Sequence, residues 1–252
     1  MGARPGINAG RSLNMTGTFL NIATVLLGGA LGLAFGSRLP DRMRQTVVAG
    51  LGLFTLAYGL IMFAGTQNPI IVLVALLFGG VLGEWWQIEA GLARLGERLQ
   101  GRFASGAEGG STRFVRGFLT ASLVFCIGPM TILGSIQDGL LGDFRLLAIK
   151  SVLDGFAAMV FASTLGIGVL FSALVILVFQ GSLSLLAHQA QAMFTDAMIA
   201  ELSATGGVLL VGIAISSLLE LKPIRVGNFL PALVLVPLIV ALLVALGISL
   251  AL

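Results

Sequence analysis

The sequence predicts an all-α, polytopic membrane protein with about eight transmembrane helices. Hydrophobic residues make up 57% of the 252 residues and charged residues only 10%, whereas a soluble domain carries about 25% charged residues. The apolar residues form runs of roughly 17–25 residues, the length that crosses a hydrocarbon core of about 30 Å as a helix. Glycines lie within these runs, where small residues let helices approach closely.

We expect a disordered polar tail over residues 1–14, with Met15 as an alternative start, and a single transmembrane domain over residues 15–252. The apolar run from residue 146 to residue 187 is too long for one span, so we divide it at its glycine-rich break. The expected spans are residues 16–36, 46–64, 69–88, 114–135, 146–164, 168–187, 203–219 and 226–250.

An amphipathic helix is expected after the third span, at about residues 88–102. Such a helix lies on a membrane surface, and Trp85 and Trp86 occupy the interfacial position that aromatic residues favour. The alternative is a solvated connector. The apolar residues that recur at helical spacing are Ile88, Leu92, Leu95 and Leu99.

Positive residues gather in alternate connections, which predicts the orientation of the chain. Cytoplasmic loops of membrane proteins carry an excess of Lys and Arg. If residues 37–45 face the cytoplasm, residues 94–116 and 220–225 do so too. We therefore expect both termini outside the cytoplasm. That orientation puts on the cytoplasmic side every Lys and Arg of the chain except Arg4, Arg11, Arg145 and Lys150.

A weak internal repeat relates the two ends of the chain. Leu27–Leu33 resembles Phe179–Leu185, with residue 29 matching residue 181. A polar connector and a glycine-rich span follow each stretch. The repeat would relate spans one to three to spans six to eight, in opposite orientations, as in the inverted repeats of many transporters. This indicates a 3+2+3 arrangement; chance recurrence of glycine in apolar helices is the alternative.

Charge gathers in one stretch of the chain, Gly134–Gly155. Asp154 and Lys150 are one helical turn apart within the fifth span, and Ser151 lies beside them. Because charge at membrane depth is expensive, a functional role is the default hypothesis: an ion ligand or a protonatable group in a translocation path. The alternative is a structural Lys–Asp pair that pins the helix.

Further polar residues flank this pair. We expect Asp138 and Asp143 in a glycine-punctuated turn, Ser135–Asp143, at the outer mouth of the path, where they could coordinate a cation. The alternative is a plain solvated turn in which Asp143 caps a helix. Gly128–Pro129 interrupts the fourth span, either freeing carbonyls for a cation or simply kinking the helix. The remaining candidates for the path are Ser135, Gln137 and Asn21.

Several protein classes are excluded by what the sequence lacks. It has no Walker-type phosphate loop, no HExxH and no CxxC, and it contains a single Cys and a single His. We therefore expect no enzyme and no cofactor, and the identity of any metal stays open. The expected partners are the lipid bilayer and a small ion or solute, with no nucleic acid. A homo-oligomer formed through glycine-rich faces is an open alternative.

Several short stretches together carry a resemblance to a known family. They are Gly17–Asn21, Gly83–Glu84, Gly117–Leu123, Gly134–Gly139, Lys150–Gly155, Phe161–Gly168 and Asn228–Ala232. On these stretches the chain resembles the domain-of-unknown-function 554 family, which comprises bacterial inner-membrane proteins of the YqgA and YdfK type. The resemblance covers residues 15–252 and implies an integral protein of the bacterial inner (plasma) membrane. Members are often described as transporters, with no substrate established.

Two functions from different classes follow. The first is a gradient-driven transporter or ion-conducting protein for a small ion or solute, with its polar path at spans four and five. The second is a non-transporting scaffold or sensor subunit, with Lys150 and Asp154 as a structural pair and residues 88–99 as a partner surface. A polar cavity lined by Asp154 would favour the first function, and a fully packed pair would favour the second.

Overall fold

The computed structural model describes residues 14–36, 40–103, 110–187 and 194–247, and within these ranges it is helical with no strand. The expected all-α class is confirmed. Apart from Asn14, the expected tail lies outside the described residues. The helices are α1 (Thr16–Gly36), α2 (Asp41–Phe63), α3 (Pro69–Trp86), α4 (Ile88–Phe103), α5 (Gly110–Cys126), α6 (Pro129–Leu141), α7 (Arg145–Leu165), η1 (Ile167–Phe171), α8 (Ser172–Leu185), α10 (Asp196–Ile213), η2 (Ala214–Leu218), η3 (Val226–Phe229) and α11 (Leu230–Ala245).

The described helices include 7 segments long and apolar enough to cross a membrane. The pair α5 and α6 forms one further candidate span, bent by 63° at its break. The protein is therefore polytopic, as expected, with eight spans when the bent pair is counted as one. The 7 segments are α1, α2, α3, α7, η1 with α8, α10 with η2, and η3 with α11.

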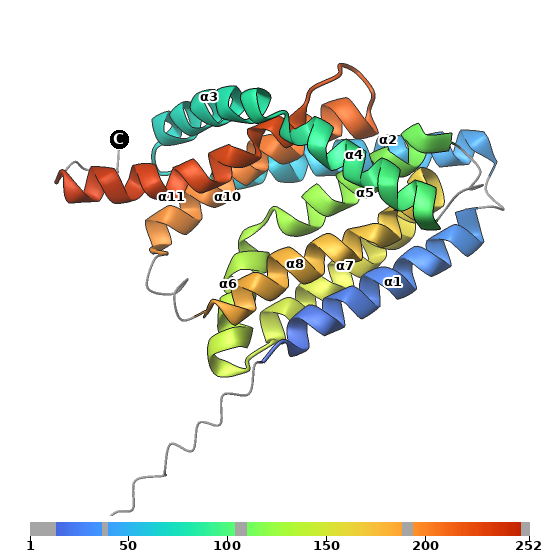
Figure 1. Cartoon of the computed structure of the whole chain (residues 1–252), viewed down its shortest axis with the longest axis horizontal. Helices are drawn as coiled ribbons and strands as arrows, with labels where there is room; N and C mark the ends of the chain where they lie inside the picture. The colour runs from blue at the N-terminus through green and yellow to red at the C-terminus, as the bar shows by residue number, and fades with distance from the viewer. Residues whose placement is uncertain (1–13, 37–39, 104–109, 188–193, 248–252) are drawn as a thin grey trace, which may run out of the picture.

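These helices form two groups with α5 between them (Figure 1). In one group α1 packs along α7 and touches α8, and in the other α2 packs along α10 and α3 along α11. Side chains of α5 join the two groups. The ring of Phe125 lies tilted against that of Phe161 on α7, with centroids 6.1 Å apart. Leu123 shares a hydrophobic cluster with Leu210 of α10.

The helix α4 is not among the candidate spans and packs on α5. Gln87 precedes it in a left-handed backbone conformation, φ 52°, which turns the chain away from α3. Gly96 of α4 faces Phe118 and Val115 of α5, and Leu99 packs in the same cluster, whereas Leu95 is 44% exposed.

Glycines set the distance between α1 and α7. A Cβ atom at Gly28 would lie 2.0 Å from the carbonyl oxygen of Gly155, and one at Gly32 would lie 2.0 Å from that of Met159. Real Cβ atoms do not approach a carbonyl so closely. The two glycines are four residues apart and therefore on one helix face, so they let the two backbones touch along a full turn, as small-residue faces do in membrane helices.

The break in the fourth span follows from Gly128–Pro129. Pro129 has no N–H to continue α5 and instead occupies the first position of α6, where none is needed. The Thr131 hydroxyl donates to the carbonyl of Phe125 at 3.2 Å, across the break. The helix α6 then ends at Gly142, whose left-handed φ of 68° is typical of a helix C-cap.

The expected turn at Ser135–Asp143 is wrong, because most of it is helical. The helix α6 continues to Leu141, so Ser135, Gln137 and Asp138 lie on a helix rather than in a turn. Gly139 suggested a turn but has a packing role: a Cβ there would lie 2.0 Å from the carbonyl oxygen of Ser184 on α8.

The seventh span also begins earlier than expected, at Asp196 rather than residue 203. Thr195 caps α10, and its side-chain oxygen accepts from the N–H of Met198 at 3.3 Å. The sequence analysis left residues 196–202 outside the expected span. The structure buries Glu201 inside α10 with its carboxylate bonded.

Gly28→Ala is expected to weaken the packing of α1 on α7. The added methyl group meets a backbone carbonyl that cannot rotate away, so we expect the free energy of unfolding to fall by about 1–3 kcal/mol. The measurement is the thermal loss of helical circular dichroism in detergent micelles. Gly50→Ala on α2 is the matched control, because a Cβ there has no neighbour within 4 Å. Equal midpoints for the two variants would contradict the account of the contact.

Candidate functional site

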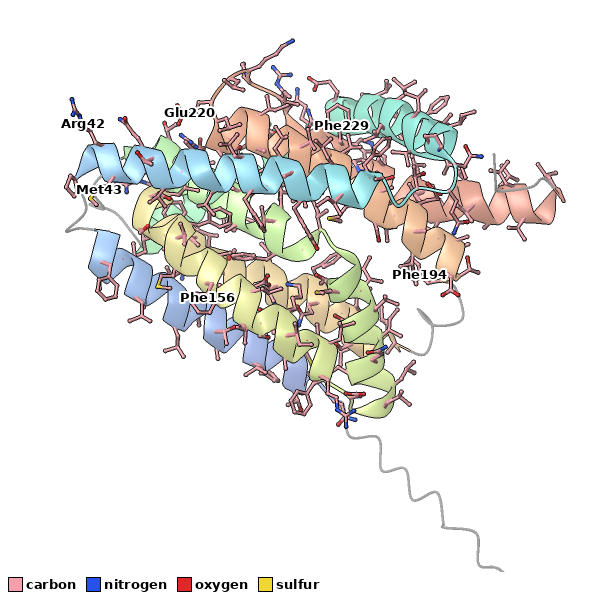
Figure 2. The ribbon with its side chains drawn as sticks, turned by 180° about the vertical axis from the view of Figure 1, so that it is seen from behind. Arg42, Met43, Phe156, Phe194, Glu220 and Phe229 are labelled. Atoms are coloured by element: carbon pink, nitrogen blue, oxygen red, sulfur yellow. The ribbon has the colours of Figure 1, made fainter. Side chains whose placement is uncertain are left out.

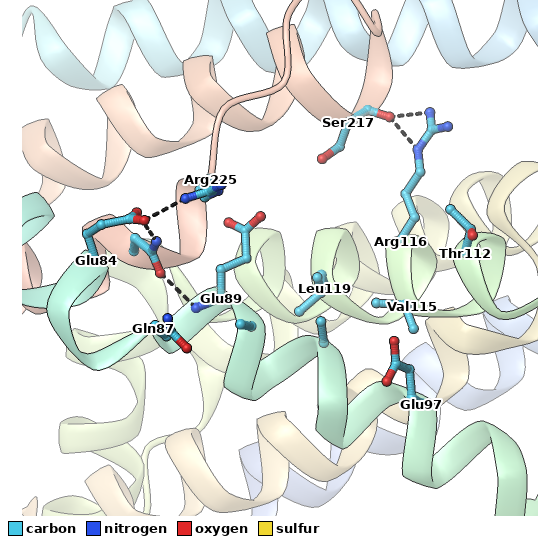
Figure 3. Close-up of a pocket in the computed structure, with 13 residues that line it drawn as sticks. Glu84, Gln87, Glu89, Glu97, Thr112, Val115, Arg116, Leu119, Ser217 and Arg225 are labelled. Atoms are coloured by element: carbon cyan, nitrogen blue, oxygen red, sulfur yellow. Dashed lines mark hydrogen bonds and ion pairs between the residues drawn. The ribbon is translucent and has the colours of Figure 1, made fainter.

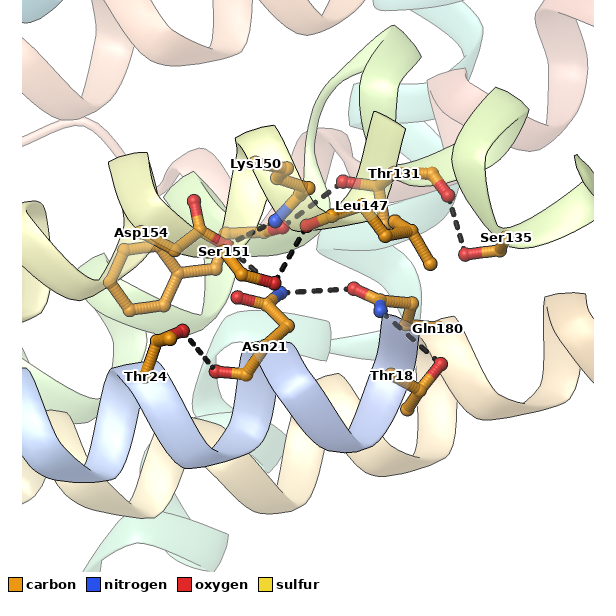
Figure 4. A network of polar contacts seen from close by, with 11 residues as sticks. Thr18, Asn21, Thr24, Thr131, Ser135, Leu147, Lys150, Ser151, Asp154 and Gln180 are labelled. Atoms are coloured by element: carbon orange, nitrogen blue, oxygen red, sulfur yellow. Dashed lines mark hydrogen bonds and ion pairs between the residues drawn. The ribbon is translucent and has the colours of Figure 1, made fainter. Parts of the chain in front are cut away.

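A buried ion pair lies in the middle of α7. The Lys150 ammonium pairs with Oδ2 of Asp154, one turn further along the same helix face. The Nδ2 group of Asn21 on α1 donates to the same oxygen at 3.0 Å, as Figure 4 shows. Lys150 is 6% exposed and Asp154 9% exposed. Asp154 lies about 14 Å along α7 from its first residue, at about 1.5 Å per residue, so the pair is at membrane depth.

The pair belongs to a polar network that joins three helices. Asn21 Nδ2 also donates to Oε1 of Gln180 on α8 at 3.0 Å. Gln180 Nε2 in turn donates to the Thr18 hydroxyl on α1 at 3.2 Å (Figure 4). Asn21, Gln180 and Thr18 are all fully buried. The network therefore connects α7, α1 and α8 without a break.

One acceptor in this network is left unpaired. Asn21 Oδ1 is buried and has no hydrogen-bond partner in the described structure. The orientation of the amide follows from its surroundings, because two acceptor oxygens, from Asp154 and Gln180, face its NH2 group. An orphaned buried acceptor costs free energy, so its presence requires an explanation.

Two of the other expected site residues bond within their own helices. Ser151 donates to the carbonyl of Leu147 at 2.6 Å, and Ser135 donates to that of Thr131 at 2.5 Å. Both are buried. Gln137 is exposed on α6, so it stands apart from the network.

Asp138 is not at a solvated rim, contrary to our expectation. Its side chain is fully buried, and Oδ2 accepts from the N–H of Gly17 at 2.9 Å. That N–H is in the first turn of α1, where a carboxylate satisfies a free donor and stabilises the positive end of the helix. Asp143 lies at the start of α7, where the alternative interpretation expected it to cap a helix. Its Oδ1 accepts from the N–H of Arg145 at 3.1 Å.

A second buried carboxylate, Glu201, has a comparable structural role. It accepts from the Thr66 hydroxyl at 2.5 Å and from the N–H groups of Gln67 and Asn68 at 2.7 and 2.9 Å. Glu201 of α10 therefore holds the connection between α2 and α3 in place. The sequence analysis did not identify Glu201. The signal that could have indicated it is a single Glu within an apolar segment.

A further polar cluster surrounds the end of α3. Glu84 accepts from Arg225 at 2.5 Å and from the Asn228 amide at 2.6 Å. The side-chain Oδ1 of Asn228 accepts from the N–H of Glu89, in the first turn of α4, at 2.8 Å. The Glu89 carboxylate accepts from the N–H of Gly227 at 2.8 Å. The sequence analysis placed Glu84 and Asn228 in stretches that carry the family resemblance but expected no contact between them. Glu84, Glu89, Arg225 and Asn228 line a cavity of about 580 Å³, which also reaches Arg116 and Ser217 (Figure 3).

Burial raises the pKa of the Glu89 carboxyl above its ordinary value. The N–H of Gly227 and the Arg225 guanidinium oppose this effect, and the neighbouring Glu84 carboxylate adds to it. The carboxyl group that joins α4 to η3 thus holds its proton more tightly than usual.

A second cavity, of about 750 Å³, lies between the two groups of helices and is mostly apolar. It is lined by residues of the α5–α6 break, such as Cys126 and Gly128, and by side chains of α8, α10 and α11. Lys150 and Asp154 line neither of these two cavities. The described residues also contain no group of three His, Cys, Asp or Glu side chains that could hold a metal ion.

Removing one member of the Lys150–Asp154 pair is expected to destabilise the fold more than removing both. Asp154→Leu leaves a buried cation without a partner, which typically costs about 3–5 kcal/mol, whereas an apolar replacement of a whole buried pair is often neutral. We expect Lys150→Met combined with Asp154→Leu to recover most of the loss, measured as unfolding midpoints in micelles. Ser151→Ala is the control for a change beside the pair. A double variant as unstable as Asp154→Leu would show that the two charges are not coupled.

Glu89→Gln is expected to make stability less dependent on pH. Because the folded-state pKa of Glu89 is raised, its contribution is present below the ordinary pKa and is lost as pH rises through the folded-state value. Gln keeps an acceptor for Gly227. The unfolding midpoint of the variant should therefore rise relative to that of the wild type as the pH increases from acidic to neutral. Glu97→Gln, at an exposed position of α4, controls for simple loss of charge. A gap that does not change with pH would contradict the assignment.

Comparisons with known proteins agree with this membrane architecture. The chain matches the family model described as protein of unknown function (DUF554) over residues 16–241. It is 34% identical over 220 residues to uncharacterized protein YqgA of Escherichia coli (strain K12), covering 87% of this chain and 93% of that protein. It is 30% identical over 239 residues to uncharacterized membrane protein YdfK of Bacillus subtilis (strain 168), covering 92% and 99% respectively. No solved structure matches. The chain therefore belongs to the DUF554 family, and its fold is that of a multi-pass membrane protein.

Proposed function

We propose that this protein is a gradient-driven transporter or ion-conducting protein for a small ion or solute. Its polar path passes the network of Lys150, Asp154, Asn21 and Gln180, beside the broken span formed by α5 and α6. The observation that carries the proposal is the ion pair itself, buried at mid-span and hydrogen-bonded to a second helix. Ionisable residues at that depth characteristically mark ion and substrate pathways.

The pair is packed and lines neither cavity, which is the arrangement expected above of a structural role. The transport proposal therefore rests on the cost of burying the pair. A buried ion pair is weak evidence for stability, because the desolvation of two charges offsets their attraction.

The break at Gly128–Pro129 supports a path beside the pair. Discontinuous helices at membrane depth are tolerated where they adjoin protein or a cavity, and in transporters they flank the binding site. Here α6 packs against α7 and α8, and the break lines the apolar cavity. Because the ion pair lines neither cavity, transport requires a second conformation in which the pair is open to water.

Two further features of the proposal concern symmetry and orientation. Each helix of the first expected trio touches its counterpart in the second, α1 with α8, α2 with α10 and α3 with α11, as helices related by an inverted repeat would. Figure 2 shows Arg42 and Glu220 toward one end of the molecule and Phe194 toward the other. The first end contains the Lys- and Arg-rich connections, so it faces the cytoplasm of the inner membrane and both termini lie outside.

A non-transporting scaffold or sensor subunit is the second candidate. The observation in its favour is the direct packing of Lys150 on Asp154, with 7% and 12% of their side chains exposed. In that case the pair would pin α7 to α1, and α4 would present the surface for a partner.

Flux measurements with purified protein in proteoliposomes test the proposal. Across a panel of ions and metabolites, at least one compound should show protein-dependent flux that Asp154→Asn abolishes while the protein level and circular dichroism are unchanged. Asp143→Asn, the same substitution at the start of α7, should leave the flux intact, because Asp143 lies outside the network. Absence of mutant-sensitive flux across the whole panel would favour the scaffold.

A further inference from the structure

The apolar cavity between the two groups of helices is a site separate from the ion pair. Its volume of about 750 Å³ lies within the range of about 300–1,000 Å³ that is typical of small-molecule sites. Side chains of α5, α6 and α10 that are at most 8% exposed form its inner wall. These are Leu123, Ile127, Ile132, Met198 and Leu202.

The cavity reaches the outer surface of the helix bundle between α8 and α11. Val234, Leu238 and Ala241 lie on one face of α11, and all three line the cavity and are exposed. On the other side, Phe179 of α8 lines the cavity and is 37% exposed. In Figure 1, α5 is seen between these two helices. Exposed apolar side chains of a membrane span face lipid, so the cavity opens to the hydrocarbon of the bilayer.

Water does not suit this cavity. A buried water molecule needs about two to four polar partners, and the cavity surface is almost entirely apolar. None of the described residues that line it is charged. The lining residues include two serines: the Ser203 hydroxyl donates to the carbonyl of Ile199 at 2.6 Å, and the Ser122 oxygen is buried in the protein.

An empty cavity of this size is also unfavourable. The side chains that line an empty apolar cavity lose van der Waals partners, and the cost rises with the volume. An apolar occupant restores these contacts without needing a polar partner. The occupant is therefore a hydrocarbon supplied by the bilayer.

The shape of the cavity matches a single lipid chain. On α11 the lining residues extend from Leu230 to Ala241, which is about 16 Å along the helix at about 1.5 Å per residue. That length is about half of a hydrocarbon core of about 30 Å, the depth over which the chains of one leaflet extend. The cavity is thus elongated in the direction of the spans.

We propose that one acyl chain of a membrane phospholipid occupies this cavity, entering between α8 and α11 and packing against α5. The chain fills the space between the two groups of helices beside the break at Gly128–Pro129. This lipid site is independent of the transport proposal, because Lys150 and Asp154 do not line the cavity.

Photochemical labelling from the lipid phase tests the proposal. The full chain is reconstituted into phospholipid liposomes containing a phosphatidylcholine with a photoactivatable diazirine in the middle of one acyl chain, and labelled residues are located by mass spectrometry. Phe54 and Ile61 on α2, 68% and 70% exposed, report contact with bulk lipid. We expect Leu123 and Ile127 to be labelled too, although they are only 8% and 6% exposed.

Two variants that fill the cavity make the test specific. Cys126→Phe on α5 and Ser203→Phe on α10 each add bulk at a lining position, so each should lower the labelling of Leu123 and Ile127 without changing that of the exposed residues on α2. Gly50→Phe is the control, because a Cβ there has no neighbour within 4 Å, and it should keep both signals. Circular dichroism in micelles checks that each variant is folded.

The wild-type result alone can overturn the proposal. Labelling of Phe54 and Ile61 without labelling of Leu123 or Ile127 would show that no lipid chain enters the cavity. If chemical cross-linking then shows a dimer in the same liposomes, a second copy of the chain covers the opening instead. Inner-wall labelling that is unchanged in both folded cavity-filling variants would contradict the proposal as well. None of these outcomes depends on flux, so they are distinguishable from a failure of the transport function.

Discussion

The contact between α1 and α7 is the constraint on which the rest of the structure depends. Gly28 and Gly32 let the α1 backbone approach the carbonyls of Gly155 and Met159, and this approach holds Asn21 within 3.0 Å of Asp154. With larger residues at the glycines the helices would separate, and Asp154 would keep only Lys150 as a partner. The polar network is thus a consequence of glycine packing as much as of the polar residues themselves.

The buried acidic residues of the described structure divide into two roles. Asp138 and Glu201 accept N–H groups at the starts of α1 and α3, where free donors and the helix dipole stabilise a carboxylate. Asp154 differs, because it lies at mid-span and is balanced by a flexible ammonium group. Backbone donors hold a carboxylate at a helix end, whereas a lysine side chain can move away from its partner, and for this reason we place the proposed path at Asp154.

Local patterns in the sequence were sufficient to predict the apolar spans and the Lys150–Asp154 pair, because span length and helical spacing need no knowledge of the fold. The roles of Asp138 and Glu201 could not be predicted in this way. Their donors, Gly17 and Asn68, are 121 and 133 residues away in the chain, so the bonds depend on how helices pack. Gly139 shows the same limit: its sequence signal favoured a turn, whereas the structure uses it for close contact with α8.

The most direct measurement of the central claim, that the pair lies on a path open to water, is thiol accessibility beside it. In a Cys126→Ala background, Ser151→Cys places one thiol next to Lys150 and Asp154 (Figure 4). The account predicts that a membrane-impermeant thiol reagent labels this position from each side of the membrane, as the path opens alternately. A folded protein that resists labelling from both sides would show that the pair is sealed within a static scaffold, and would contradict the claim.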